Sequence, residues 1–97
     1  MLMNVKQTQV FTKWLNGVRD NKAKAAIVLR IRRATLGNLG TVRSVGKGVS
    51  EMKIDVGQGY RVYYTMRQQT IVILLCGGTK STQPHDISAA QLMAAQF

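Results

Sequence analysis

Residues 49–76 read VSEMKIDVGQGYRVYYTMRQQTIVILLC and contain three strand-like runs separated by short turns. In the first run, residues 49–56, apolar and charged side chains alternate, as they do on a strand with one buried face. The second run, residues 60–67, is built from strand-favouring residues, and the third, residues 71–76, is apolar throughout, which is typical of a strand covered on both faces. The tight turns GQG and RQQ join the runs, so this stretch predicts an antiparallel meander.

The second run, residues 60–67, carries its charge on one face. Arg61, Tyr63 and Arg67 share that side of the strand, because successive side chains point to opposite faces. Lys53 lies on the charged side of the preceding run, so it is expected to face the same way as Arg61. Two interpretations are open at this point: a solvated face, or a site that holds an anion.

The segments that flank the meander show helical spacing or turn composition. They are a short edge strand within residues 5–11, a helix at residues 11–18, a helix at residues 21–36 capped by Asp20 or Asn21 and ended by Gly37, a short strand at residues 41–45, a loop at residues 77–86 and a last helix at residues 87–97. The whole chain, residues 1–97, is therefore predicted to be one α+β domain. A small antiparallel sheet packs against an N-terminal helical hairpin, with a short C-terminal helix.

The composition restricts the function more than the fold. Fourteen Lys and Arg residues against four Asp and Glu give a net charge of +10, which attracts polyanions, most often nucleic acid. One Cys, one His and four scattered acids do not form a zinc or carboxylate site, so no metal or other cofactor is expected. The first ten residues contain no long apolar segment of the kind found in signal peptides, and the longest apolar run is too short to span a membrane, so we expect a cytoplasmic protein with no membrane partner.

The basic and aromatic residues suit a phosphodiester. Arginine holds phosphate oxygens with a planar fork, and tyrosine or histidine can stack on a base. The set expected to surround one concave surface is Lys47, Lys53, Arg61, Arg67, Lys80 and His85, with Tyr63 beside Arg61. Such a set also suits metal-free RNA cleavage, in which the 2′-OH attacks the adjacent phosphate while side chains move protons and hold the developing charge.

Six motifs occur in order along residues 11–83: F-x-x-W-L, A-x-I-x-x-R-I-x-R, L-G-N-x-G, V-G-x-G-V-S-E, G-x-G-Y-R-V-Y-Y and L-L-C-G-G-x-K-S-x-Q. In these motifs the chain closely resembles the addiction-module killer proteins, the phage-Gp49-like (HigB-like) branch of the RelE/ParE toxin superfamily. The resemblance implies the RelE-like, microbial-RNase-like α+β fold. It also implies a toxin of a type II toxin–antitoxin module, which inhibits translation as a ribosome-dependent, metal-independent mRNA endoribonuclease.

The resemblance also suggests partners and site residues. The expected partners are mRNA, the ribosome and a cognate HigA-like helix-turn-helix antitoxin. The catalytic residues that it implies are the strand arginine Arg61, the strand lysine Lys53, the loop lysine Lys80 and, in place of a C-terminal tyrosine, His85. The expected RNA-binding residues are Lys47, Tyr63, Arg67, Ser81 and Gln83. ParE-type relatives share the fold and inhibit DNA gyrase by protein binding, which is the alternative function.

Overall fold

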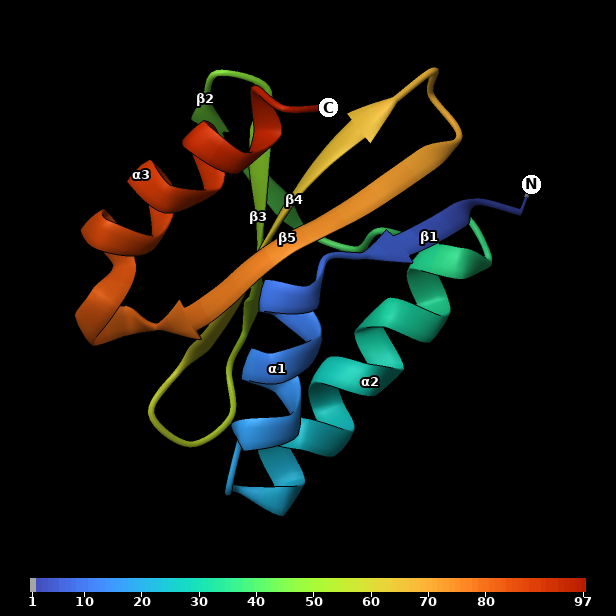
Figure 1. Cartoon of the computed structure of the whole chain (residues 1–97). Coiled ribbons are helices and arrows are strands. Elements are labelled where there is room, and N and C mark those ends of the chain that lie inside the picture. Colours follow the sequence, from blue (N-terminus) through green and yellow to red (C-terminus); the bar gives the residue numbers. More distant parts are fainter. Residues whose placement is uncertain (1) are drawn as a thin grey trace.

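Two layers of helix enclose a five-stranded sheet in the computed structural model, which describes residues 2–97. The elements are β1 (Asn4–Gln7), α1 (Gln9–Gly17), α2 (Asn21–Thr35), β2 (Val42–Gly46), β3 (Val49–Ile54), β4 (Tyr60–Arg67), β5 (Ile71–Thr79), a 3-10 turn (Lys80–Thr82) and α3 (Gln83–Ala94). The hairpin of α1 and α2 lies on one face of the sheet and α3 on the other (Figure 1). No helix within residues 2–97 is long and apolar enough to cross a membrane.

The strand order is β1-β5-β4-β3-β2, in which β3 to β5 form the antiparallel meander expected from the sequence and β2 extends it by one antiparallel strand. β1 pairs with β5 in parallel, Val5 lying opposite Val72, so the sheet is mixed rather than purely antiparallel. β4 occupies the central position, and β5 lies second from the edge although both of its faces are covered, by α1 and α3. The alternation along a strand shows which side chains lie on each face of the sheet, but it does not show which strands pair with it. For this reason the sequence did not predict the parallel pairing of β1 with β5.

Alternation along β3 and β4 assigns their side chains to the two faces as predicted, but both faces are buried rather than one. Met52 on β3 and Val62 on β4 pack under the α1–α2 hairpin, whereas Tyr63 packs under α3. The register of β4 with β5 shifts between Tyr63 and Tyr64, and Leu75 is the extra residue on β5. This bulge reverses the alternation of the last residues of β5 and therefore decides which face each of them meets.

The sequence signals at the ends of α2 are confirmed. Oδ1 of Asp20 accepts hydrogen bonds from the backbone N–H groups of Lys22 and Ala23, at 3.0 and 3.1 Å. Such a cap typically contributes about 1 kcal/mol. After the last turn, Gly37 adopts φ 91° and its N–H donates to the carbonyl of Ala34 at 2.9 Å, as in a glycine-terminated helix.

The prediction of a loop at residues 77–86 is wrong. β5 continues to Thr79, and α3 begins at Gln83 with Pro84 in its first turn. Gly77 and Gly78 are typical of a turn in the sequence, but in the structure they lie within β5. The absence of a side chain at these positions lets side chains from α1 and α3 approach the strand backbone closely. A Cβ on Gly77 would overlap the Trp14 ring, and a Cβ on Gly78 would overlap the carboxylate of Asp86.

The close contact between Gly77 and Trp14 leads to a stability prediction. Gly77→Ala is expected to lower the free energy of unfolding by about 1–3 kcal/mol, because the indole ring must move to make room for the methyl group. Urea denaturation followed by circular dichroism measures the change. Gly17→Ala is the matched control: nothing lies within 4 Å of its added Cβ, so it should be neutral or stabilising by up to about 1 kcal/mol. Equal effects of the two substitutions would contradict this account of Gly77.

Candidate functional site: a basic cavity on the sheet

A cavity of about 340 Å³ opens on the α3 side of the sheet. It is lined by side chains from β2, β3 and β4, from the segment before β2 and from the first residue of α3, namely Thr41, Val42, Arg43, Glu51, Lys53, Arg61 and Gln83. Three cations therefore surround one carboxylate in this space. Two of the predicted catalytic residues, Arg61 and Lys53, lie directly opposite one another on β4 and β3.

Arg61 is the most buried cation of the cavity, with 6% of its surface exposed. Its Nε donates to Oε1 of Glu51 at 3.2 Å, which anchors one side of the guanidinium. Its Nη1 is buried and has no hydrogen-bond partner within residues 2–97. A buried donor without a partner is costly, so a ligand that accepts a hydrogen bond there would be favoured.

Glu51 connects the residues around Arg61. Its carboxylate is 4% exposed and accepts hydrogen bonds from Arg43 Nη2 at 2.9 Å, Arg61 Nε at 3.2 Å and Gln83 Nε2 at 2.8 Å. The hydrogen bond to Glu51 raises the pKa of Arg43 above its ordinary value. The carboxylate thus ties β2, β4 and the start of α3 to β3 and holds the guanidinium of Arg61 in one orientation.

Gly59 lies between Lys80 and Arg61 and brings the two residues close together. The N–H of Lys80 donates to the carbonyl of Gly59 at 3.1 Å. A Cβ on Gly59, which has φ 80°, would lie 3.7 Å from Nη1 of Arg61 and 3.9 Å from Cβ of Lys80. The structure therefore brings the backbone of Lys80 next to Arg61, at the border of the cavity that Arg61, Lys53 and Gln83 line.

Two of the expected site residues have structural positions instead. Tyr63 is fully buried under α3, and burial raises the pKa of its hydroxyl. Its ring has no exposed face for stacking on a base, so the stacking role predicted for it is wrong. Arg67 donates from Nη2 to the carbonyl of Ala94 at 3.0 Å and from Nε to that of Phe97 at 3.2 Å. Its guanidinium caps the C-terminus of α3, as cations commonly do.

The other three expected residues lie outside the cavity. His85 is exposed and is two residues beyond Gln83 on α3, which places the two side chains on different sides of the first turn. Lys47 sits in the turn between β2 and β3 and lines a separate cavity with Leu92 of α3. Ser81 forms a hydrogen bond of 2.9 Å with the Thr79 hydroxyl. The ring of basic residues expected from the sequence is therefore divided between several places on the surface.

Sequence reasoning missed Glu51 and Arg43 as members of the site. The alternation along residues 49–56 was a signal for Glu51, and the pairing of β2 with β3 then brings in Arg43. Glu51 shares the face of Lys53 by alternation, and its cross-strand neighbours are Arg43 on β2 and Tyr63 on β4. Within residues 2–97, no group of three His, Cys, Asp or Glu side chains gathers in a way that could hold a metal ion.

The fold defines the class of protein. The chain superposes on the structure of a mutant of the E. coli toxin RelE in the free state, with a TM-score of 0.73 over 95% of this chain and 96% of that one. The sequence identity is 10%, so this likeness establishes the RelE fold, as the motifs predicted.

Sequence comparison identifies the family. Residues 13–96 match the family described as "Phage derived protein Gp49-like (DUF891)", and the chain belongs to this family. An uncharacterised protein from Haemophilus influenzae (strain KW20 / Rd) is 47% identical over 97 residues, which covers all of this chain and 98% of that protein. The family and the fold together confirm the resemblance to the RelE/ParE superfamily of toxins.

Proposed function

We propose that the protein is the toxin of a type II toxin–antitoxin module and acts in the cytoplasm as a ribosome-dependent, metal-independent mRNA endoribonuclease. The observation that carries the proposal is the buried guanidinium of Arg61, which is anchored through Nε and leaves Nη1 unpartnered in a basic cavity. Membership of the family and the RelE fold support a toxin that is neutralised by an antitoxin. A HigA-like helix-turn-helix protein is the antitoxin that the motifs favour.

The cavity can hold the scissile phosphate. Nη1 of Arg61 would donate to a phosphate oxygen, with the ammonium groups of Lys53 and Lys80 as further cations. As the 2′-oxygen attacks phosphorus, negative charge grows on the non-bridging oxygens. A cation that is already in place stabilises this charge without reorganisation, and this is where the largest rate contribution is expected.

Two proton transfers complete the reaction. The 2′-OH must lose a proton as its oxygen bonds to phosphorus, and the departing 5′-oxygen must gain one, leaving a 2′,3′-cyclic phosphate. Among the cavity-lining residues Glu51 is the carboxylate, and its three hydrogen bonds leave one of roughly four lone-pair positions free to accept the first proton. Lys80 or Lys53 would donate the second. His85 is given no part in this scheme, because it is exposed on α3 and, unlike Lys80, it is not brought next to Arg61 by Gly59.

The alternative is a ParE-like inhibitor that binds DNA gyrase. The observation that favours it is an exposed apolar strip on α2, where Val28 and Leu29 are 41% and 44% exposed and are flanked by Lys24 and Arg32. Such a strip suits contact with another protein. An inhibitor that binds through this strip would give no role to the basic cavity around Arg61. The ribonuclease uses that cavity, so it remains the leading proposal.

Pulse-labelling after induction tests the proposal. Protein, RNA and DNA synthesis are followed separately in cells that express the wild-type chain or the Arg61→Lys variant. We expect protein synthesis to stop first with the wild type, with new 5′ ends inside translated messages, and no early arrest with the variant. Arrest of DNA synthesis before protein synthesis, at equal strength in both strains, would support the gyrase inhibitor and refute the ribonuclease.

A further inference from the structure

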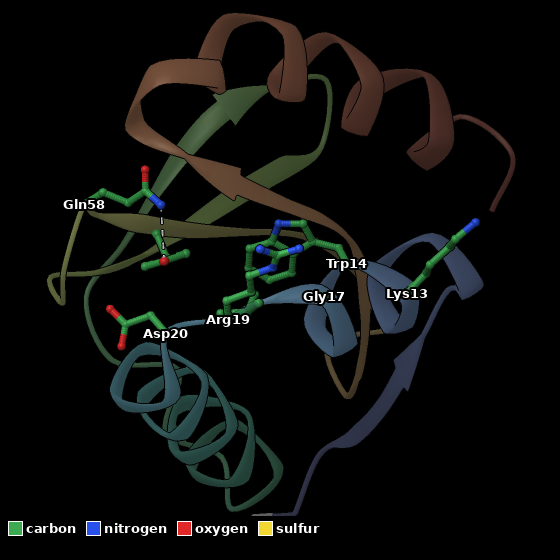
Figure 2. A pocket seen from close by; sticks show the side chains of 8 residues that line it. Lys13, Trp14, Gly17, Arg19, Asp20 and Gln58 are labelled. Atoms are coloured by element: carbon green, nitrogen blue, oxygen red, sulfur yellow. Dashed lines mark hydrogen bonds between the residues drawn. The ribbon is translucent and has the colours of Figure 1, made fainter.

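A second cavity, of about 630 Å³, lies where α1 ends and the chain turns into α2 (Figure 2). Its lining residues are Lys13, Trp14, Gly17, Val18, Arg19, Asp20, Gln58 and Tyr60. Its size falls within the about 300–1,000 Å³ that is usual for small-molecule sites. Tyr60 and Arg61 are consecutive on β4 and point to opposite faces, so this cavity and the Arg61 cavity lie on opposite faces of the sheet beside the same β3–β4 loop.

Two aromatic rings and the exposed amide of Gln58 line this second cavity. Tyr60 is a core residue with 6% of its surface exposed, so the partly buried Trp14 offers the larger ring surface. The ring of Trp14 packs on Gly77 of β5, and its centroid lies 6.5 Å from that of Tyr60. Nε2 of Gln58 donates to the Tyr60 hydroxyl at 3.3 Å, the bond drawn as a dashed line in Figure 2. Gln58 thereby leaves its carbonyl oxygen and one N–H available to a ligand. Flat rings beside an amide suit a nucleobase.

Two cations border the cavity, and Figure 2 shows that they point in different directions, with the Lys13 side chain extending away from Arg19, Asp20 and Gln58. In the described part of the chain, residues 2–97, the side chains of Lys13 and Arg19 form no hydrogen bond or ion pair. The one carboxylate that lines the cavity, Asp20, binds the first N–H groups of α2 through Oδ1 and keeps its negative charge. A free cation in the same cavity as an aromatic ring suits a ligand that joins a base to a phosphate.

Gly17 leaves its side of the cavity open. It is the exposed last residue of α1, nothing lies within 4 Å of an added Cβ, and its φ is not in the left-handed region. A larger side chain can therefore be placed here without a clash, which makes this position suitable for testing whether the cavity binds a ligand.

We propose that this cavity binds one nucleotide of a single-stranded RNA, with the base against the partly exposed ring of Trp14 and the phosphate at Arg19. RNA as the ligand rests on the function proposed above. Because the two cavities adjoin the same β3–β4 loop, one RNA chain can place its scissile phosphate at Arg61 and a second nucleotide here. The second cavity then contributes to affinity and to the choice of RNA, while the chemistry takes place at Arg61.

Trp14 is the single tryptophan of the chain and reports on this cavity by its fluorescence. The toxin is titrated with adenosine 5′-monophosphate and with a single-stranded RNA hexanucleotide. Both are expected to quench the emission, and inorganic phosphate alone is expected not to. Gly17→Leu, which fills the cavity, should weaken RNA binding at least tenfold. Arg19→Gln should weaken it about three- to tenfold and reduce its dependence on salt.

Two controls separate this inference from the proposed function. Arg61→Lys should lose cleavage and keep the quenching of Trp14. Gly17→Leu should keep its circular dichroism spectrum and unfolding midpoint. Unchanged RNA affinity in Gly17→Leu and Arg19→Gln would overturn the proposal, even if Arg61→Lys is inactive. It would also be overturned if the two substitutions left RNA binding intact and abolished binding of the antitoxin, which would make the cavity a protein contact.

Discussion

Arg61→Lys is expected to lower the rate of RNA cleavage by about 10²–10³-fold, the usual cost of removing one donor from a developing oxyanion. Lysine keeps a positive charge beside Glu51, but it lacks the second nitrogen that Arg61 leaves unpartnered in the cavity. The rate is measured with purified toxin on ribosomes that carry a defined message, and growth arrest in cells should disappear in parallel.

The choice of lysine follows from the burial of Arg61. Alanine at this position would leave the buried carboxylate of Glu51 without one of its partners, and the loss of one partner of a buried pair typically costs about 3–5 kcal/mol. Inactivity of Arg61→Ala could therefore result from unfolding. A folded Arg61→Lys protein that cleaves at the wild-type rate would show that the arginine has no role in the reaction.

Glu51→Gln is expected to lower the free energy of unfolding by about 3–5 kcal/mol. The substitution removes the charge that balances the buried guanidinium of Arg61, and it turns one acceptor oxygen into a donor that faces other donors. Urea denaturation measures the change. It should be clear in a domain of this size, because total stabilities are generally about 5–15 kcal/mol.

Asp55→Asn is the matched control for Glu51→Gln. Asp55 pairs with Lys53 at 3.6 Å, but both side chains are largely exposed, so its replacement should cost less than about 1 kcal/mol. A second test is the double variant Glu51→Gln/Arg61→Met, which should be more stable than Glu51→Gln alone, because it removes the uncompensated charge. Similar losses for Glu51→Gln and Asp55→Asn would mean that the buried pair does not stabilise the fold.

The sequence predicted most of the sheet and part of the site. Alternation across residues 49–67 specified which residues of β3 and β4 share a face, and it predicted that Lys53 and Arg61 face the same way. Their position directly opposite one another comes from the register of the two strands. Glu51 lies on that same face, but its sequence neighbours do not show that three different segments converge on it. A charged residue on a strand looks the same in the sequence whether water or a buried partner surrounds it.

What the sequence by itself determined is the local order: the strand periods, the cap at Asp20, the glycine end of α2 and the face shared by Lys53 and Arg61. Only the tertiary structure decided which of the basic and aromatic residues remain free. The packing of α3 on the sheet buries Tyr63, draws Arg67 to its C-terminus and turns His85 away from the cavity. The reason is physical: periodicity is a property of neighbours along the chain, whereas burial and hydrogen-bond partners depend on segments that meet only after folding.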